Sequence, residues 1–183
     1  MSNIISPEIK DASKLTNEEW KEWTKTVWSI ANISDGIHPA VYPPEIPYRL
    51  IRMFSFVGET VLDPFSGMAT TGRVALQNNR SYIGFETNPI YYSESLRRLT
   101  ELELPESSYN CRYEISNSSS CDMSHVKDNS VGIVVTSPPY WNKADYGEYD
   151  GNIGGFEYYD DFLTELKKVF AECYRVLKPG RKM

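Results

Sequence analysis

The segment Asp63-Pro64-Phe65-Ser66-Gly67-Met68-Ala69-Thr70-Thr71 decides the fold of this chain. The short apolar run Val61-Leu62 before it is typical of a buried strand, and a helical pattern follows it. In an open α/β sheet, such a strand-to-helix turn lies at the carboxyl end of the strand, where ligands bind. Gly67 lets the backbone approach a ligand closely, and Thr70 and Thr71 are suited to cap the helix. We therefore interpret the segment as a ligand-binding turn, with a purely structural turn as the alternative.

Strand and helix patterns alternate along most of the chain. Apolar runs predict strands at 61–62, 82–85, 111–115 and 131–135, and helical periodicity predicts helices at 47–56, 70–77, 89–102 and 159–177. This alternation is typical of α/β proteins and predicts a doubly wound, mostly parallel sheet. We divide the chain into an N-terminal arm and helix, residues 1–35, and an α/β domain, residues 36–183.

The N-terminal part is expected to contribute one helix. Residues 1–15 lack periodicity and are predicted to form a loose arm, whereas Thr16 and Glu19 have the spacing of a capping box that begins a helix. An apolar stripe follows at helical spacing and consists of Trp20, Trp23, Val27 and Ile30. The stripe predicts that this helix packs against the rest of the protein.

Composition excludes several classes of protein. With 183 residues and 40% hydrophobic content, the chain can bury one core. It has no apolar run near the roughly 18 residues of a membrane span and no secretory signal, so a cytoplasmic location is expected. The three cysteines, Cys111, Cys121 and Cys173, are far apart in the sequence, which predicts buried thiols rather than disulfides or a metal site. The net charge of −6 disfavours a nucleic-acid partner unless basic residues gather locally or in a separate recognition region.

A second motif, Ser137-Pro138-Pro139-Tyr140, follows the strand predicted at 131–135. The prolines stiffen the loop and carry no N–H donors, which leaves carbonyl oxygens free to accept hydrogen bonds. The Ser137 hydroxyl and the Pro138 carbonyl would therefore suit the exocyclic amino group of a base, and Tyr140 offers a face for stacking. A rigid turn with core aromatics is the alternative interpretation.

Two acidic residues follow the next predicted strands. Glu86 comes after Asp63 at close to the roughly 20-residue interval at which an acidic side chain binds ribose hydroxyls in nucleoside-binding sheets. Asp122 would accept from an adenine amino group, or would only form a turn in its Ser-rich loop. A phosphate loop and a Gly-x-Gly-x-x-Gly dinucleotide turn are both absent, which disfavours nucleoside triphosphates and oxidoreductase chemistry.

Taken in order, these segments resemble the amino-methylating DNA methyltransferases, whose motifs are a DPF-x-G-x-G-T-T turn and an (S/D/N)-P-P-(Y/F/W) loop. The likeness covers roughly residues 36–180 and implies a Rossmann-like methyltransferase fold with S-adenosylmethionine as cofactor. The segment His38-Pro39-Ala40-Val41-Tyr42-Pro43 is similar to the one that lies over the methionine part of the cofactor. The resemblance implies cofactor binding by His38, Pro39, Ala40, Asp63, Pro64, Phe65, Ser66, Gly67, Thr70, Thr71, Glu86 and Asp122, and catalysis by Ser137, Pro138, Pro139 and Tyr140.

The Ser form of the catalytic loop is typical of enzymes that methylate the N4 amino group of cytosine. The resemblance therefore implies methylation of flipped-out cytosine in double-stranded DNA, in a restriction-modification system, without a metal. The alternatives are an adenine N6 DNA methyltransferase, an RNA methyltransferase, or a cofactor-binding subunit of a split enzyme. For such a subunit, inactivity alone but activity after a further polypeptide is added would distinguish a half-enzyme from a pure scaffold.

The sequence departs from the family pattern at two places. Ala69 replaces a motif glycine, and residues 175–180 resemble the element that leads into the fifth strand of the family. Because the sequence ends soon after this element, we expect the fourth strand to lack a neighbour and an apolar sheet edge to stay open. A second polypeptide would then supply the remaining strands and the target-recognition region. The Gly-rich stretch 147–155 is expected to be a loop over the substrate or only a connector.

Overall fold

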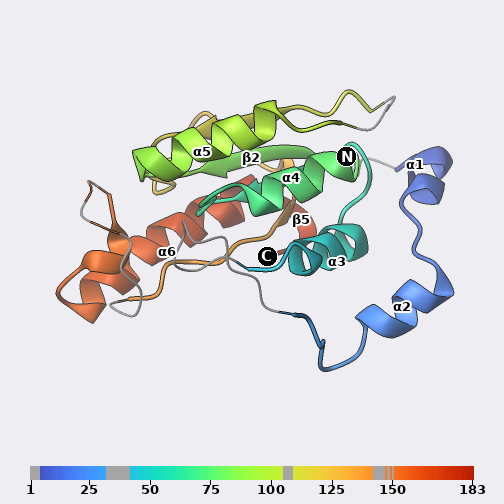
Figure 1. Cartoon of the computed structure of the whole chain (residues 1–183), viewed down its shortest axis with the longest axis horizontal. Coiled ribbons are helices and arrows are strands. Elements are labelled where there is room, and N and C mark those ends of the chain that lie inside the picture. Colours follow the sequence, from blue (N-terminus) through green and yellow to red (C-terminus); the bar gives the residue numbers. More distant parts are fainter. Residues whose placement is uncertain (1–4, 32–41, 105–108, 142–146, 148, 150) are drawn as a thin grey trace.

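The computed structural model describes residues 5–31, 42–104, 109–141, 147, 149 and 151–183. Within these ranges the strands form one sheet in the order β3-β2-β1-β4-β5, and every neighbouring pair is parallel (Figure 1). The strands are β1 (Thr60–Asp63), β2 (Ser81–Phe85), β3 (Tyr113–Ser116), β4 (Val131–Val134) and β5 (Leu177–Lys182). The α/β class and the parallel sheet predicted from the alternating pattern are therefore confirmed.

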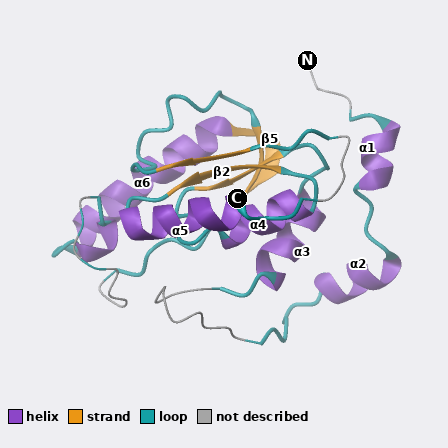
Figure 2. Ribbon diagram, turned by 45° about the horizontal axis from the view of Figure 1, so that its top comes forward, coloured by secondary structure: helices purple, strands orange, loops and turns teal. Residues whose placement is uncertain are grey.

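Helices cover both faces of the sheet. They are α1 (Pro7–Ala12), α2 (Asn17–Trp23), α3 (Glu45–Phe54), α4 (Thr70–Gln77), α5 (Pro89–Thr100) and α6 (Tyr159–Val176), with a short 3-10 helix at Ile153–Gly155. Figure 2 shows α3, α4 and α5 along one face of the sheet and α6 along the other. Two layers of helices around a parallel sheet give the doubly wound arrangement that the sequence predicts.

The core is divided by the sheet into two clusters. Because successive strand residues point to opposite faces, Val61 packs toward α3, α4 and α5, whereas its neighbour Leu62 packs toward α6. On the first face the cluster includes Ile51 and Leu99, and on the second face Val169 packs with Leu62. The sheet is therefore buried on both sides, as its nearly continuous apolar strands require.

The helix predicted at 159–177 is α6, and it buries one apolar face. Phe162, Val169, Cys173 and Val176 of α6 are buried. All three cysteines are free; Cys173 is buried, but Cys111 and Cys121 are only half-buried, so the expectation of buried thiols holds fully for one of them. Among the helices of the described residues, none is long and apolar enough to cross a membrane.

The expectation that β4 lacks a neighbour is wrong. β5 follows α6 without a loop and pairs with β4, with Val131 opposite Leu177 and an irregularity before Ile133 meets Lys182. Pro179 and Gly180, at φ +78°, make this strand unlike a typical apolar β-run, which is why the pattern did not predict it.

Ion pairs hold β5 against the start of β1. The carboxylate of Glu59, whose side chain is 7% exposed, accepts from Lys178 Nζ at 2.9 Å and from Arg181 at 2.6 Å. Glu59 Oε2 also accepts from the backbone N–H of Phe56 at 2.9 Å. A buried carboxylate needs such partners, so the cations of β5 balance a charge that the sheet already contains.

Two expectations for the N-terminal part are also corrected. The segment predicted as a loose arm contains α1, and Ser13 after it is buried and accepts from the backbone N–H of Val57 at 2.9 Å. The capping box of Thr16 and Glu19 is confirmed, but α2 ends at Trp23 and leaves Val27 76% exposed. The predicted stripe therefore packs mainly through Trp23, whose ring meets that of Tyr48 edge-on at 5.4 Å.

Candidate functional site

A hollow lies at the carboxyl edge of the sheet, where β1, β2 and β4 end. It encloses about 890 Å³, including the space at its mouth that is open to solvent. It is lined by residues that follow different strands, so the fold brings together segments that are far apart in the sequence. The predicted site residues that line it are Pro64, Phe65, Ser66, Gly67, Thr70, Glu86, Ser137 and Pro139.

The β1 turn (residues 64–69) is fixed by hydrogen bonds to other parts of the protein. Ser66 donates its backbone N–H to the Phe85 carbonyl at 2.8 Å, and its hydroxyl contacts the Tyr82 hydroxyl at 2.8 Å. Gly67, at φ +52°, accepts from Ser95 Oγ at 2.6 Å. The left-handed conformation at Gly67 is one that glycine adopts without strain, so the turn keeps its backbone close to the hollow.

Glu86 provides a buried carboxylate in the wall of the hollow. Its Oε2 accepts from the backbone N–H of Gly67 at 2.8 Å, and its Oε1 accepts from the backbone N–H of Asn88 at 2.8 Å. Burial raises the pKa of Glu86 to about 7, although these two hydrogen bonds oppose the shift. Each oxygen has a further lone pair, so the carboxylate can accept two hydroxyl donors from a ligand.

Asp63 lies behind the wall rather than in it. Its side chain is buried; Oδ2 accepts from Thr71 Oγ1 at 2.7 Å, and Oδ1 accepts from Thr136 Oγ1 at 2.7 Å and from the backbone N–H of Phe65 at 3.1 Å. Thr71 Oγ1 also contacts the hydroxyl of Tyr42. Burial raises the pKa of Asp63, against the effect of these donors. Neither Asp63 nor Thr71 lines the hollow.

The start of α4 differs from the predicted cap. The N-cap residue is Ala69 and not Thr70 or Thr71, and no side chain caps the helix. Thr70 and Thr71 are the first two residues inside the helix, and the Thr71 hydroxyl donates to Asp63. Ala69 has φ +56°, a left-handed conformation in which an alanine is strained and a glycine is not. The left-handed backbone at this position explains why a glycine suits the corresponding place of the motif that this segment resembles.

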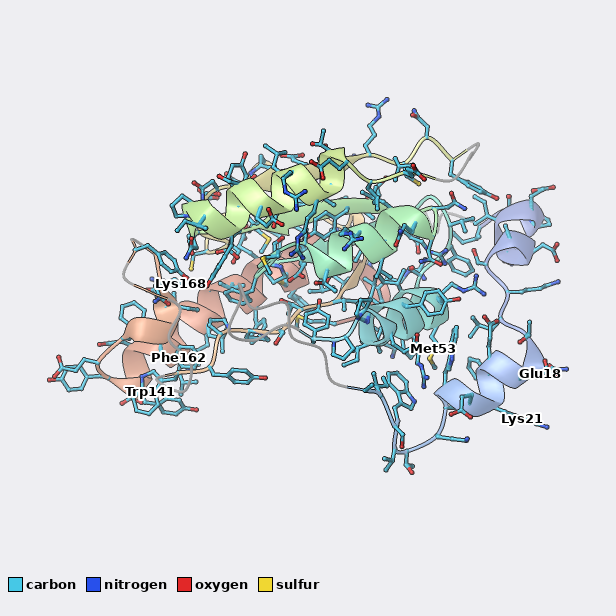
Figure 3. The ribbon with its side chains drawn as sticks, viewed as in Figure 1. Glu18, Lys21, Met53, Trp141, Phe162 and Lys168 are labelled. Atoms are coloured by element: carbon cyan, nitrogen blue, oxygen red, sulfur yellow. The ribbon has the colours of Figure 1, made fainter. Side chains whose placement is uncertain are left out.

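The Pro-Pro loop (residues 137–140) extends from β4 to the mouth of the hollow. Ser137 and Pro139 line the hollow, whereas Pro138 and Tyr140 do not, and the side chain of Tyr140 is 54% exposed. After the loop, Trp141 donates its Nε1–H to the Phe156 carbonyl at 2.9 Å. Figure 3 places Trp141 beside Phe162, at the end of the molecule opposite α1 and α2.

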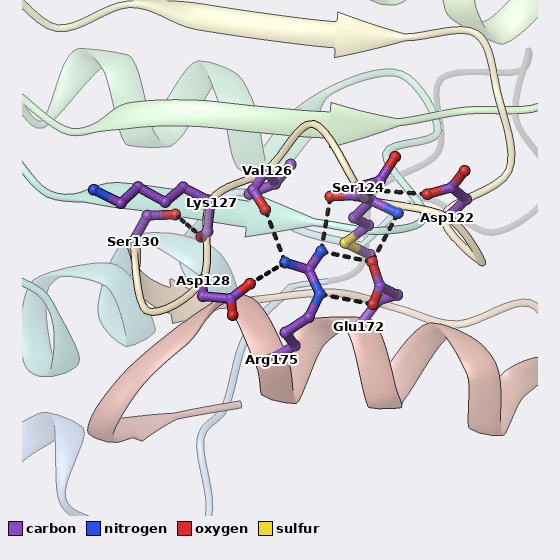
Figure 4. Close-up of polar contacts among 9 residues, drawn as sticks. Asp122, Ser124, Val126, Lys127, Asp128, Ser130, Glu172 and Arg175 are labelled. Carbon is purple, nitrogen blue, oxygen red and sulfur yellow. Dashed lines mark hydrogen bonds and ion pairs between the residues drawn. The ribbon is translucent and has the colours of Figure 1, made fainter.

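Asp122 is placed away from the hollow. It accepts from the backbone N–H of Ser124 at 2.9 Å, which is the turn-forming role weighed as its alternative. The loop around it is held on α6 by Arg175, which donates to the Met123 carbonyl at 2.8 Å and pairs with Glu172 at 2.7 Å (Figure 4). The neighbouring serines 118–120 line the hollow instead.

Several lining residues were missed by the sequence interpretation. They are Tyr42, Met68, Phe85, Thr87, Tyr91, Ser118, Ser119, Ser120, Tyr149, Gly151, Asn152, Ile153 and Val169. Tyr42 belongs to the segment that resembles the methionine-covering one, and residues 149–153 belong to the Gly-rich stretch, so weak signals existed for both. The predicted His38, Pro39 and Ala40 lie outside the described residues. In the described ranges, no cluster of three or more His, Cys, Asp or Glu side chains could hold a metal ion.

Comparison with known proteins identifies related sequences. The model of a DNA methylase family, of the N6/N4 type, matches residues 2–97 and 131–183. Type II methyltransferase M.MjaI of Methanocaldococcus jannaschii is 43% identical over 84 residues, which cover 43% of this chain and 27% of that protein. DNA adenine methyltransferase YhdJ of Escherichia coli is 45% identical over 62 residues, which cover 34% of this chain and 21% of that protein. The chain thus matches about a quarter of the length of these relatives.

A solved structure supports the same relationship. TTHA0409 of Thermus thermophilus, assigned as a DNA modification methylase, superimposes with a TM-score of 0.50 at 30% identity. The superposition covers 62% of this chain and 44% of that one. An rRNA-methylase structure from Clostridium thermocellum superimposes with a TM-score of 0.52 at 18% identity, which shows a shared fold only.

Proposed function

Since this chain belongs to the DNA methylase family of the N6/N4 type, we propose that it methylates DNA at the exocyclic N4 amino group of cytosine, with S-adenosylmethionine as methyl donor. The family membership rests on a match over most of the chain. A role in a restriction-modification system is part of the proposal, because the relatives include Type II methyltransferases.

The hollow fits S-adenosylmethionine. Glu86 presents a buried carboxylate with two acceptor oxygens, which suits a ribose hydroxyl pair. Phe85 and Ile153 give the wall an apolar surface beside Ser119 and Ser120, so an aromatic base and a polar edge can both be accommodated. Gly67 keeps the backbone of the β1 turn close to the ligand. When bound, the cofactor supplies a methyl group on a positively charged sulfur, which is a good leaving group.

The Pro-Pro loop would bind the amino group that receives the methyl. Ser137 Oγ and the Pro138 carbonyl accept the amino hydrogens, which concentrates electron density on the nitrogen and stabilises the charge that develops there. Tyr140, an exposed residue at the mouth of the hollow, stacks on the extruded base. A nitrogen–carbon bond forms, a carbon–sulfur bond breaks, and the extra proton leaves the nitrogen for solvent at the open mouth.

One observation carries this proposal. Glu86 and Gly67 on one side, and Ser137 and Pro139 on the other, line the same hollow although they follow three different strands. A site for a nucleoside cofactor and a site for a planar amino group are therefore adjacent, as a direct transfer requires.

DNA is the proposed macromolecular partner. The net charge of −6 means that this chain is not suited by its total charge to bind a phosphate backbone. We therefore retain the proposal that a further region or a second polypeptide supplies target recognition and most phosphate contacts. Adding such a polypeptide is expected to increase affinity for DNA, with a steep dependence on salt concentration.

Adenine N6 methylation is the second candidate. It is favoured by the similarity to YhdJ, which is named a DNA adenine methyltransferase. Both reactions use the same kind of loop, and the serine at position 137 is the residue that favours cytosine here.

The experiment is to incubate the chain with isotopically labelled S-adenosylmethionine and unmethylated DNA, digest the DNA, and identify the labelled nucleosides by mass spectrometry. N4-methylcytosine is the expected product. N6-methyladenine would replace the proposal by the second candidate. If labelled RNA formed in a parallel reaction but labelled DNA did not, the DNA assignment would be wrong. Binding of the product S-adenosylhomocysteine, measured by calorimetry, tests the cofactor site separately from turnover.

A further inference from the structure

The carboxylate of Asp63 connects the two halves of the site from behind. It accepts from the backbone N–H of Phe65, in the β1 turn, and from the hydroxyl of Thr136, which directly precedes Ser137. Both donors reach the same oxygen, Oδ1, so a displacement of one changes the geometry of the other. Asp63 therefore joins the turn that lines one side of the hollow to the loop that lines the other.

The hydrogen bond from Thr136 to Asp63 lies where the Pro-Pro loop leaves the sheet. β1 and β4 are neighbours, with Leu62 opposite Val134, and Val135 donates its backbone N–H to the Leu62 carbonyl at 3.0 Å. Thr136 is the next residue, and the two prolines beyond it have no N–H to donate. The Thr136 hydroxyl is therefore well placed to set the direction in which the Pro-Pro loop leaves the sheet.

The surroundings of Asp63 hold the carboxylate in place. Its second oxygen, Oδ2, accepts from Thr71 Oγ1 in α4, and Thr71 contacts Tyr42. The side chain is 1% exposed and does not line the hollow. A buried carboxylate with several donors is costly to move, because any lost partner leaves charge unpaired in an apolar environment.

We infer that Asp63 is a positioning residue and not a cofactor ligand, and that through Thr136 it couples occupation of the β1 turn to the placement of the Pro-Pro loop. This inference rests on the proposed function, since it takes the hollow to be the cofactor site. It assigns a role to Thr136, which the sequence interpretation did not single out.

The test follows Trp141, which lies immediately after the Pro-Pro loop. The full chain is labelled with 5-fluorotryptophan, the Trp141 signal is assigned by its loss in Trp141→Phe, and S-adenosylhomocysteine is added. In the unaltered chain the Trp141 fluorine signal is expected to shift on binding. In Thr136→Val, which removes the hydroxyl but keeps the branched shape, the shift is expected to be lost. Thr136→Ser, which keeps the hydroxyl, is expected to restore it.

Calorimetry on the same samples separates coupling from damage to the site. The Kd for S-adenosylhomocysteine is expected to change by less than about threefold in Thr136→Val, because Thr136 does not line the hollow. Thr164→Val on the exposed side of α6, where the hydroxyl donates to the Asp160 carbonyl, is the matched control and should leave the Trp141 shift intact. A role of Thr136 in stability alone would lower the unfolding midpoint but leave the shift unchanged.

Two results would overturn the inference in different ways. If Thr136→Val binds the ligand and shows the same Trp141 shift as the unaltered chain, the coupling does not exist while the cofactor site stands. If the unaltered chain does not bind S-adenosylhomocysteine, the proposed function fails and the coupling fails with it. A ligand-free difference between the Trp141 signals of Thr136→Val and Thr136→Ser would support the positioning of the loop by the hydroxyl.

Discussion

The β1 turn and the Pro-Pro loop follow adjacent parallel strands and line the same hollow, but they are held in different ways. In the β1 turn, hydrogen bonds reach both the backbone and the side chain of Ser66, and both the N–H and the carbonyl of Gly67. The bonds described for the Pro-Pro loop lie at its flanks, at Thr136 and Trp141. The side of the hollow that would hold the cofactor is thus preorganised by hydrogen bonds, whereas the side that would hold the base is a short segment that two prolines stiffen.

This difference has a physical explanation. A small ligand that is always the same benefits from a fixed site, because little ordering is left to be done on binding. A base that is extruded from a duplex is held by its own strand, and the proposed task of the Pro-Pro loop is to bind the amino group that reacts. Changes in the β1 turn should therefore alter affinity and stability, and changes in the loop should alter turnover.

The largest effect is expected for Ser137→Ala in the loop. Loss of one hydrogen-bond acceptor at the reacting group should lower turnover about 100- to 1000-fold, the effect typical of removing one group that stabilises developing charge. The Kd for S-adenosylhomocysteine should stay nearly unchanged. Steady-state methylation and calorimetry give the two values, and Ser29→Ala, at an exposed position, is the control. Equal losses in turnover and affinity would show that Ser137 is a structural residue. The β1 turn and the Pro-Pro loop would then no longer differ in which of the two quantities they affect.

The next effect concerns the dependence of stability on pH, which arises in the β1-turn region. The pKa of Glu86 is raised to about 7 from its usual 4.5, so between these values the folded chain keeps a proton that the unfolded chain has lost. The free energy of unfolding should therefore fall as pH rises from about 5 to 7, by about 3 kcal/mol at most. The raised pKa of Asp63 acts in the same direction. Urea unfolding without ligand measures this slope.

Glu86→Gln is the matched variant for the pH experiment. An amide does not titrate, so the slope between pH 5 and 7 should become flatter, whereas Glu103→Gln at an exposed position should leave it unchanged. A slope that is identical in all three proteins would show that Glu86 is not the titrating group.

The same variant should weaken cofactor binding by about 10- to 30-fold, because charge-assisted hydrogen bonds are replaced by neutral ones and one backbone N–H loses its acceptor. Calorimetry with S-adenosylhomocysteine at pH 8 measures this change, and turnover at saturating cofactor should fall much less. A fall in turnover without a change in affinity would show that Glu86 acts on the reaction and not on cofactor binding, which would contradict the roles proposed for the β1-turn region and the loop.

The smallest effect compares two alanines that are both fully buried. Ala69→Gly removes a methyl group but relieves a left-handed alanine, whereas Ala75→Gly removes a methyl group from the interior of α4. Ala75→Gly should lower the free energy of unfolding by about 2 kcal/mol, from lost burial and poorer helix propensity. Ala69→Gly should cost about 1 to 2 kcal/mol less, since the strain is released. Equal losses in chemical denaturation would remove backbone strain from the description of the β1 turn.

The sequence predicts where a helix begins when the contacts that start the helix lie within the same few residues. The helix predicted at 89–102 begins where α5 does, and its start has a local cause, since the Asn88 side chain accepts from the backbone N–H of Ile90 at 2.9 Å. The helix at 70–77 is predicted with the right bounds but for the wrong reason. Its threonine hydroxyl is used by Asp63, a contact that depends on how the turn folds back on β1.

What the sequence could not reveal depends on contacts between distant residues. The motif places Asp63 beside the ligand-binding turn, but only the fold shows that its carboxylate points inward, toward Thr136. Ser119, in a loop after β3, and Ile153, in the short 3-10 helix, line the hollow although both are far from the β1 turn in the sequence. β5 is recognised by its pairing with β4 and by the charge of Glu59, neither of which appears in its own residue pattern.

The pairing of Glu59 with the cations of β5 has a consequence during synthesis. Glu59 precedes Lys178 by 119 residues and Arg181 by 122 residues. At translation rates of 5 to 20 residues per second, its partners leave the ribosome about 6 to 24 s later. Until then the carboxylate of Glu59, just before β1, has neither cation, and burying it is costly. β5 is therefore expected to join the sheet only after Lys178 and Arg181 have left the ribosome.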